Sequence, residues 1–145
     1  MTNKNMLRTA LIAGLALWQM PTLAADVQQP VPKAIVQPLM DKDLEGIPGK
    51  ELLMLTVEYL PGGASLPHRH DAQVCVYVLQ GELTMQVEGG PPVTLHQGQT
   101  FYESRTDVHV VSANASKTAT AKILVFMVKD KNAPVSRDVA VKTAP

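Results

Sequence analysis

Short apolar runs separated by turn residues dominate the chain from Glu51 onward. The runs lie at 51–60, 73–80, 82–87, 92–95, 99–104, 107–114 and 121–129. Several are rich in β-branched residues, and turn residues separate them at intervals of about ten residues. No long stretch of this region repeats its apolar residues with the period of a helix. The pattern therefore predicts an all-β domain over residues 51–130, built as a single antiparallel barrel or sandwich.

The segments that flank this region are polar and contain several prolines. Residues 25–50 are expected to be an extended lead-in, with room for one short turn before Gly46, Pro48 and Gly49. Residues 131–145 are a polar tail that could add an edge strand to the sheet. The sequence thus places the boundaries of the folded domain near residues 51 and 130.

The first 24 residues have the features of a secretory signal. Lys4 and Arg8 give a positive start, the apolar run 10–18 is short for a membrane span, and small residues precede the expected cut after Ala24. A buried N-terminal helix and a retained membrane anchor are the alternatives, and the polar break after Trp18 argues against both. We therefore expect a periplasmic or secreted protein that is free of the membrane after cleavage.

Charge and cysteine content limit the partners and the covalent links that we expect of this chain. Cleavage would leave eleven basic and thirteen acidic residues with no basic stripe among the aromatics, so nucleic acid is not an expected partner. The single cysteine, Cys75, excludes an internal disulfide. Within its strand-like run Cys75 is expected to be a buried small apolar residue, and a thiolate ligand or a redox sensor is the alternative.

Two histidines one residue apart are the first chemical signal. Side chains alternate between the faces of a strand, so His68 and His70 in "PHRH" point the same way and could bind one metal ion. His109 is the third candidate ligand, since a barrel can place its run across from this pair. His96 precedes a glycine turn without such a partner, and we expect it to be solvated.

The histidines lie in two segments that resemble the motifs of the cupin superfamily. "PGGASLPHRH" followed by "YVLQGEL" is similar to the first motif, G-x5-H-x-H-x3/4-E-x6-G, and "GQTFYESRTDVHVVSAN" resembles the second. The matching residues are Gly62, His68, His70, Gly81, Gly98 and His109. The resemblance covers roughly residues 50–130. It implies a cupin jelly-roll barrel that holds a divalent metal ion, with Fe, Mn, Zn, Cu and Ni not distinguished by imidazole ligands.

The chain departs from the first motif at the acidic ligand. The motif spacing places this glutamate at Val74, or at Cys75 in its longer form, and neither is a carboxylate. Glu103 and water are the leading candidates for the fourth ligand, ahead of Gln73, with Cys75 last because alternation turns it away from the face of Val74. The alternative for Glu103 is a solvated acid at a strand end. Three imidazoles without a carboxylate would leave the ion its full +2 charge and open coordination positions.

The resemblance allows three functions, and the sequence does not choose among them. An enzyme of the dioxygenase, isomerase or lyase type would act on a small organic molecule, with Glu103 as general base and Tyr77 or Tyr102 as donors. A non-catalytic cupin that binds a metal or a ligand is the alternative, and a metal-free structural barrel is the third possibility. The expected apolar pocket is lined by Met54, Val76, Val78, Met85, Phe101 and Phe126.

The resemblance also implies which groups surround the imidazoles and how the chains assemble. Polar side chains should orient the imidazoles, and Gln73, Asp71 and Glu103 are the candidates. Small cupins commonly pair through edge strands. A homodimer is therefore expected, with the apolar run 51–60 and the tail as its contact.

Overall fold

Residues 34–140, the part of the chain that the computed structural model describes, form ten strands and no helix. The strands are β1 Ile35–Asp43, β2 Lys50–Tyr59, β3 His68–Arg69, β4 Ala72–Gln80, β5 Glu82–Val87, β6 Val93–His96, β7 Thr100–Glu103, β8 Val108–Asn114, β9 Ala121–Asp130 and β10 Arg137–Asp138. The all-β prediction is therefore confirmed. The expected secretory signal lies outside the described residues. No helix long and apolar enough to cross a membrane occurs within residues 34–140.

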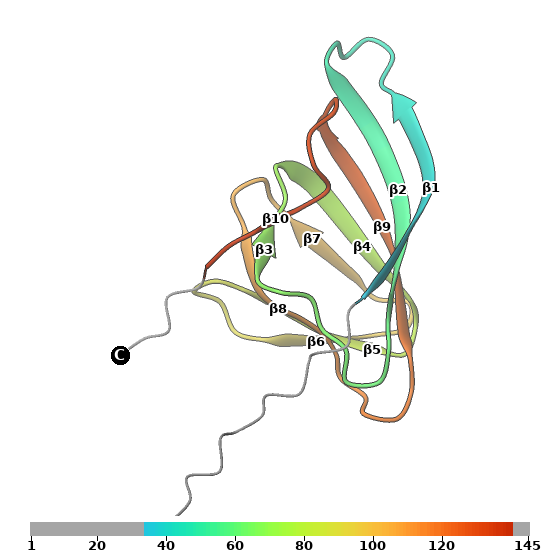
Figure 1. Ribbon diagram of the computed structural model, residues 1–145, viewed down its shortest axis with the longest axis vertical. Coiled ribbons are helices and arrows are strands. Elements are labelled where there is room, and N and C mark those ends of the chain that lie inside the picture. The colour runs from blue at the N-terminus through green and yellow to red at the C-terminus, as the bar shows by residue number, and fades with distance from the viewer. Residues whose placement is uncertain (1–33, 141–145) are drawn as a thin grey trace, which may run out of the picture.

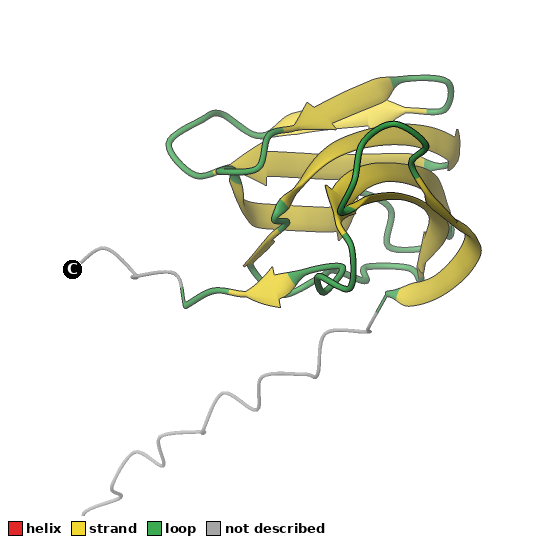
Figure 2. Ribbon diagram, turned by 90° about the horizontal axis from the view of Figure 1, so that it is seen from above, coloured by secondary structure: helices red, strands yellow, loops and turns green. Residues whose placement is uncertain are grey.

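The strands form two five-stranded antiparallel sheets whose concave faces enclose the core (Figure 1; Figure 2). One sheet has the order β1-β2-β9-β4-β7 and the other the order β10-β3-β8-β5-β6. The chain passes repeatedly from one sheet to the other, since β3, β5, β6 and β8 lie in the second sheet and β4, β7 and β9 in the first. This crossing connectivity is that of the jelly-roll class expected from the sequence.

Strict alternation of buried and exposed residues fixes which side chains enter the core. In β4 the inward residues are Val74, Val76 and Val78, and in β9 they include Val125 and Met127. Burying each such side chain contributes about 1.5–3 kcal/mol to folding. The second sheet adds the buried side chains of Leu83, Met85 and Leu95. Valine, leucine and isoleucine thus supply most of the core.

The folded unit begins earlier than the boundary expected at Glu51. β1 pairs antiparallel with β2 from Ile35↔Glu58 to Asp43↔Glu51, with an irregularity between Pro38 and Met40. Proline cannot donate a ladder hydrogen bond, so its presence suits an edge strand with a bulge and hides the strand from sequence patterns. β1 pairs with the edge of β2, so β2 is an inner strand of the sheet. The prediction that the run 51–60 forms an edge-strand dimer contact is therefore wrong.

Candidate metal centre and its pocket

Three histidines from two adjacent strands meet at one end of the core. His68 in β3 lies directly opposite His109 in β8, and His70 follows β3 by one residue. The ring centroids are 4.9 Å apart for His68 and His70, 5.4 Å for His68 and His109, and 5.8 Å for His70 and His109. The structure therefore brings together all three imidazoles that the sequence singled out.

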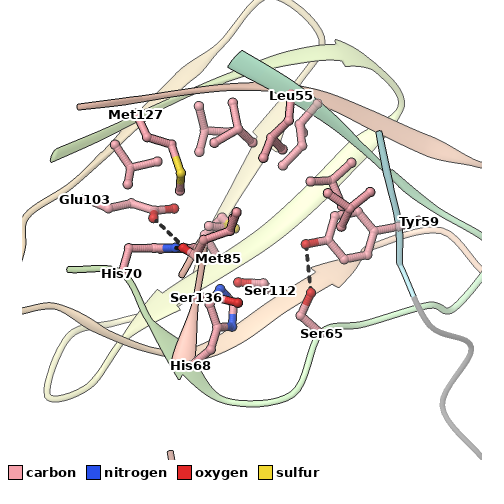
Figure 3. Close-up of a pocket in the computed structure, with 17 residues that line it drawn as sticks. Leu55, Tyr59, Ser65, His68, His70, Met85, Glu103, Ser112, Met127 and Ser136 are labelled. Carbon is pink, nitrogen blue, oxygen red and sulfur yellow. Dashed lines mark hydrogen bonds and ion pairs between the residues drawn. The ribbon is translucent and has the colours of Figure 1, made fainter. Parts of the chain in front are cut away.

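Glu103 completes this group from the opposite sheet. It ends β7, where it pairs with Val74 of β4, and only 3% of its surface is exposed. Its Oε2 lies 3.4 Å from Nε2 of His70 (Figure 3) and 3.2 Å from Nε2 of His109. Glu103 is thus a buried side chain that faces the imidazoles, and the alternative of a solvated strand-end acid does not describe it.

Backbone carbonyls orient two of the rings. Nδ1 of His68 lies 2.7 Å from the carbonyl oxygen of Leu66, and Nδ1 of His70 lies 2.6 Å from that of Val135. A carbonyl only accepts, so each Nδ1 donates and each Nε2 keeps its lone pair for a ligand. We expected side chains to orient the rings. Asp71 instead accepts a hydrogen bond from Arg137. Sequence patterns do not reveal these carbonyl contacts.

The Val135 carbonyl belongs to a C-terminal segment that is held at four points. Lys129 Nζ donates to the carbonyl of Ala133 at 2.7 Å, Arg137 Nε donates to Asp71 at 2.8 Å, and the amide of Val139 donates to the carbonyl of Pro67 at 2.9 Å. The fourth point is the bond to His70. The tail therefore forms part of the site in addition to adding the edge strand β10.

Burial favours the uncharged forms of Glu103, His70 and His109 at neutral pH. Burial, with a smaller contribution from Asp107, raises the pKa of Glu103 to about 8. Burial, with smaller contributions from His68 and His70, lowers the pKa of His109 to about 4. Burial also lowers the pKa of His70. A protonated carboxyl group therefore faces the neutral imidazoles of His70 and His109, and their close approach is not a salt bridge at pH 7.

The spacing of these groups and their unused hydrogen-bonding capacity fit a metal ion. Two ligand atoms of a tetrahedral site with bonds of 2.0–2.1 Å lie about 3.3 Å apart, close to the two Glu103–imidazole separations. Within the described residues, Glu103 Oε2 and both ring nitrogens of His109 are buried without a hydrogen-bond partner. Buried polar groups are nearly always satisfied, so such a cluster points to a missing partner.

The three imidazoles and Glu103 lie close together without the geometry of a formed metal site. Among residues 34–140, no group of three or more His, Cys, Asp or Glu side chains already has the geometry of a metal site.

The site opens on a mainly apolar cavity of about 90 Å³ (Figure 3). Its apolar wall comes largely from β2, β4 and β9, and its polar wall consists of Tyr59, Ser65, His68, His70, Glu103, Ser112 and Ser136. A wider hollow of about 620 Å³ adjoins it and shares Val36, Ser65, His68 and Ser136 with it. His68 therefore lies at the junction between the inner cavity and the outer hollow.

The expected pocket lining is correct for two residues. Val76 and Met85 line the cavity, whereas Val78 and Phe101 belong to the core without lining it. The prediction is wrong for Met54 and Phe126, which are cross-strand partners on the outer face of the first sheet. The run 51–60 is apolar on both faces, so its sequence does not show which residues point inward.

The remaining candidates on β4 and β7 lie on that outer face. Gln73 is exposed and accepts a hydrogen bond from the hydroxyl of Tyr102, which removes Gln73 from the ligand set. Cys75 is exposed, contrary to the expected burial, because its strand neighbours Val74 and Val76 take the inward positions. Tyr77 and Tyr102 also point outward and cannot donate a proton inside the cavity.

His96 behaves as expected of a solvated residue. It ends β6, is exposed, and its Nδ1 lies 3.0 Å from a carboxylate oxygen of Glu82. It is therefore separate from the three clustered histidines.

Four hydroxyl residues of the cavity, Tyr59, Ser65, Ser112 and Ser136, were not singled out from the sequence. Ser112 is hidden from simple alternation, because it lies three residues after His109 and should face the other side. The β5–β8 pairing shifts register between Gln86↔Val111 and Val87↔His109, which leaves Val110 as an extra residue. This bulge turns Ser112 to the same side as His109.

Comparison with known proteins agrees with the fold. The model of the cupin domain matches residues 55–127, which are half of the chain. This chain belongs to the cupin family. No protein of curated function matches the sequence.

Solved cupin structures are similar over most of the chain. An uncharacterised Klebsiella pneumoniae protein with a double-stranded β-helix domain is 19% identical, with a TM-score of 0.55 over 70% of this chain and 81% of its own. An oxalate oxidase in complex with the substrate analogue glycolate is 26% identical, with a TM-score of 0.55 over 77% of this chain and 58% of its own.

A lyase is also among the similar structures. The DMSP lyase DddQ from Ruegeria pomeroyi is 19% identical, with a TM-score of 0.54 over 64% of this chain. The present cupin spans only 45% of the length of that lyase chain. At this identity the likeness establishes the shared fold alone.

Proposed function

We propose that this cupin binds a divalent metal ion through His68, His70, His109 and Glu103 and acts on a small organic molecule in the adjoining cavity. The observation that carries the proposal is the position of Glu103 Oε2, buried without a hydrogen bond and 3.2–3.4 Å from two imidazole nitrogens. A carboxyl group placed in this way costs folding free energy unless a cation or a ligand uses it.

The chemistry of the donor set indicates what such an ion would supply. Three neutral imidazoles and one carboxylate would leave a divalent ion with a net charge of +1, able to polarise an oxygen atom of a bound molecule. The chain's own residues would hold, orient and dehydrate that molecule. His68 lies at the entrance, while the valine and methionine side chains exclude water behind it.

Glu103 has two possible roles, and one variant separates them. As a ligand it would lose its proton on metal binding, and as a general base it would exchange a proton with the substrate while its pKa stays near neutrality. Glu103→Gln should lower metal occupancy if the carboxylate is a ligand. It should lower turnover at full occupancy if the carboxylate is the base.

The decisive experiment measures the metal content of protein purified without chelators or a metal-affinity tag. Near-stoichiometric metal in the wild type, lost in His109→Ala and retained in His96→Ala, would support the site. His96 is the matched control because it is a histidine of the same fold outside the cluster. Metal-free wild-type protein that also fails to take up Fe, Mn, Zn, Cu or Ni would contradict the proposal.

The reaction class is proposed from the structural neighbours. They include an oxidase whose name states that it acts on oxalate and a lyase named for DMSP, so oxidation or elimination reactions of small organic acids should be tested first. Stoichiometric metal without turnover of any such acid would favour the second candidate, a non-catalytic binding cupin. The small inner cavity is compatible with that role as well.

Export and dimerisation stay predictions. The N-terminal 24 residues support export, and cell fractionation with N-terminal sequencing of the mature protein tests it. A homodimer would now be expected to use the edge of β1, where Ile35, Val36 and Leu39 are exposed. Light scattering of the purified protein gives the oligomeric state.

A further inference from the structure

Three hydroxyl groups gather on a part of the cavity wall that the proposed metal site does not use. The hydroxyl of Tyr59 lies 3.1 Å from Oγ of Ser65, and the amide of Ser65 donates to the carbonyl oxygen of Ser112 at 2.9 Å. Figure 3 shows Tyr59 and Ser65 on the side of the cavity away from Glu103, with Ser112 drawn between Ser65 and His68. These residues come from β2, the loop after it, and β8.

Ser112 is the member of this group that points to a ligand. Only 3% of its surface is exposed, and within the described residues its Oγ has no hydrogen-bond partner. Its unused hydroxyl in a cavity wall therefore indicates that something inside the cavity accepts from it.

Tyr59 and Ser65 add a further hydrogen-bond donor that no protein group uses. Their two hydroxyls share one hydrogen bond, in which one of the two protons is used, so the other remains available to a third group. Burial raises the pKa of Tyr59, which keeps its phenol protonated and a donor. Asn114 holds the end of β2 in place, because its Nδ2 donates to the carbonyl of Tyr59 at 3.1 Å.

The charge of the cavity wall decides which oxygen these donors suit. Among the described residues that line the cavity, none is Lys or Arg, so a second anionic group would meet no positive charge at the hydroxyl end. The net +1 charge expected of a metal-loaded site balances one carboxylate. Neutral O–H donors are then matched by an uncharged oxygen, either a carbonyl or a hydroxyl.

We propose that Tyr59, Ser65 and Ser112 form a subsite for an uncharged oxygen of a short carboxylic acid whose carboxylate lies at the imidazole–Glu103 end. This inference rests on the proposed function and names its substrate class. The cavity of about 90 Å³ is smaller than the roughly 150 Å³ that accommodates benzene in an apolar protein cavity. The acid therefore has about six non-hydrogen atoms or fewer, as in short hydroxy acids and oxo acids.

A pair of ligands of equal size tests the subsite. 3-Hydroxypropionate and butyrate differ only in a hydroxyl group that replaces a methyl group, far from the carboxylate. Titration calorimetry on the metal-loaded full-length mature protein should give roughly ten-fold tighter binding of 3-hydroxypropionate, about the effect of one or two buried hydrogen bonds. Ser112→Ala and Tyr59→Phe should each reduce this ratio to within about two-fold, with the affinity for butyrate and the metal content unchanged.

The controls separate this inference from the proposed function. Tyr102→Phe removes a hydroxyl on the outer face and should leave the ratio as in the wild type. The same titrations on metal-free protein should show weaker binding of both acids with the preference retained. A chain that binds no metal contradicts the metal site alone. The ratio of the affinities for 3-hydroxypropionate and butyrate on metal-free protein then still tests the subsite. Equal affinities for the two acids, or a ratio that Ser112→Ala does not change, would overturn it.

Discussion

Glu103 and Val74 are direct cross-strand partners in β7 and β4, and both side chains point into the core. Paired positions place their Cβ atoms about 5 Å apart. The spacing of the first cupin motif places the acidic ligand on β4, at Val74. The carboxylate of Glu103 therefore enters the same region from the neighbouring strand, and the site has its acidic group one strand away from the motif position.

This relationship predicts that the acidic ligand can be exchanged between the two strands. Glu103→Val should weaken metal binding by at least about ten-fold, since each factor of ten corresponds to 1.4 kcal/mol of lost coordination free energy. Adding Val74→Glu to that variant should restore part of the affinity, because the new carboxylate points into the same cavity. Competition with a chromogenic chelator measures both affinities.

The control for this exchange is Glu82→Gln, which removes an exposed carboxylate outside the cavity. It should bind metal as the wild type does. Unchanged affinity in Glu103→Val would remove Glu103 from the ligand set.

Metal binding should release protons from Glu103. With a pKa of about 8, this carboxyl group is roughly nine-tenths protonated at pH 7, and a coordinated carboxylate must be deprotonated. His109 contributes none, because its pKa of about 4 leaves it neutral. Calorimetry in buffers of different ionisation enthalpy should report close to one proton per ion at pH 7, falling to about 0.1 at pH 9. Glu103→Gln should release almost none, and release that does not depend on pH would contradict the assignment.

The metal-free protein should lose stability as the pH rises above about 6.5. The folded pKa of Glu103 lies above its value of about 4.5 in the unfolded chain, so its favourable contribution is complete below pH 4.5 and is lost as the pH approaches 8. The folded pKa of His109 is depressed from about 6.5 to about 4, so its contribution is complete above pH 6.5 and is lost on acidification. Between pH 4.5 and 6.5 the Glu103 contribution lowers the free energy of unfolding as the pH rises, and the His109 contribution raises it.

Above pH 6.5 only the Glu103 slope remains. The loss between pH 6.5 and 8 is at most about 2 kcal/mol, at 1.36 kcal/mol per pH unit. Denaturant titrations of metal-free protein should show this decline, and Glu103→Gln should flatten it. A decline of equal size in the variant would assign the pH dependence to other groups.

A buried ion pair anchors the tail to the sheet. Lys129 Nζ donates to Glu51 and to the carbonyl of Ala133, and both charged side chains are buried. Lys129→Met leaves the carboxylate of Glu51 without a cation and should destabilise the fold by about 3–5 kcal/mol. The double variant Glu51→Leu/Lys129→Met should recover much of this loss, as measured by urea unfolding. A double variant as unstable as the sum of the two single variants would show that the charges do not compensate each other.

The parts of the fold that follow simple alternation were predictable from the sequence, and those that break it were not. The spacing of His68 and His70 and the apolar runs of β4 and β9 determine the site and the all-β class. The face of Glu103 stayed open, because a four-residue strand gives too short a pattern to set its phase. Ser112 was missed because the bulge at Val110 reverses the alternation.

The backbone groups that hydrogen-bond to the histidines were also not predictable from the sequence. The carbonyl oxygen of Val135 carries no residue-specific signal, and Val135 is 65 positions away from the histidine that it orients. β1 was hidden by Pro38 and by the exposure of nearly all its residues. These features depend on tertiary contacts, which local propensity does not encode.

The four attachments of the C-terminal segment have a practical meaning for anyone preparing this protein. A purification handle added after this segment would follow the stretch whose Val135 carbonyl orients the ring of His70. Metal occupancy and affinity measured on such a fusion would include binding by the handle as well as by the proposed site. Protein without a C-terminal handle is therefore the appropriate starting point for every assay that probes these histidines.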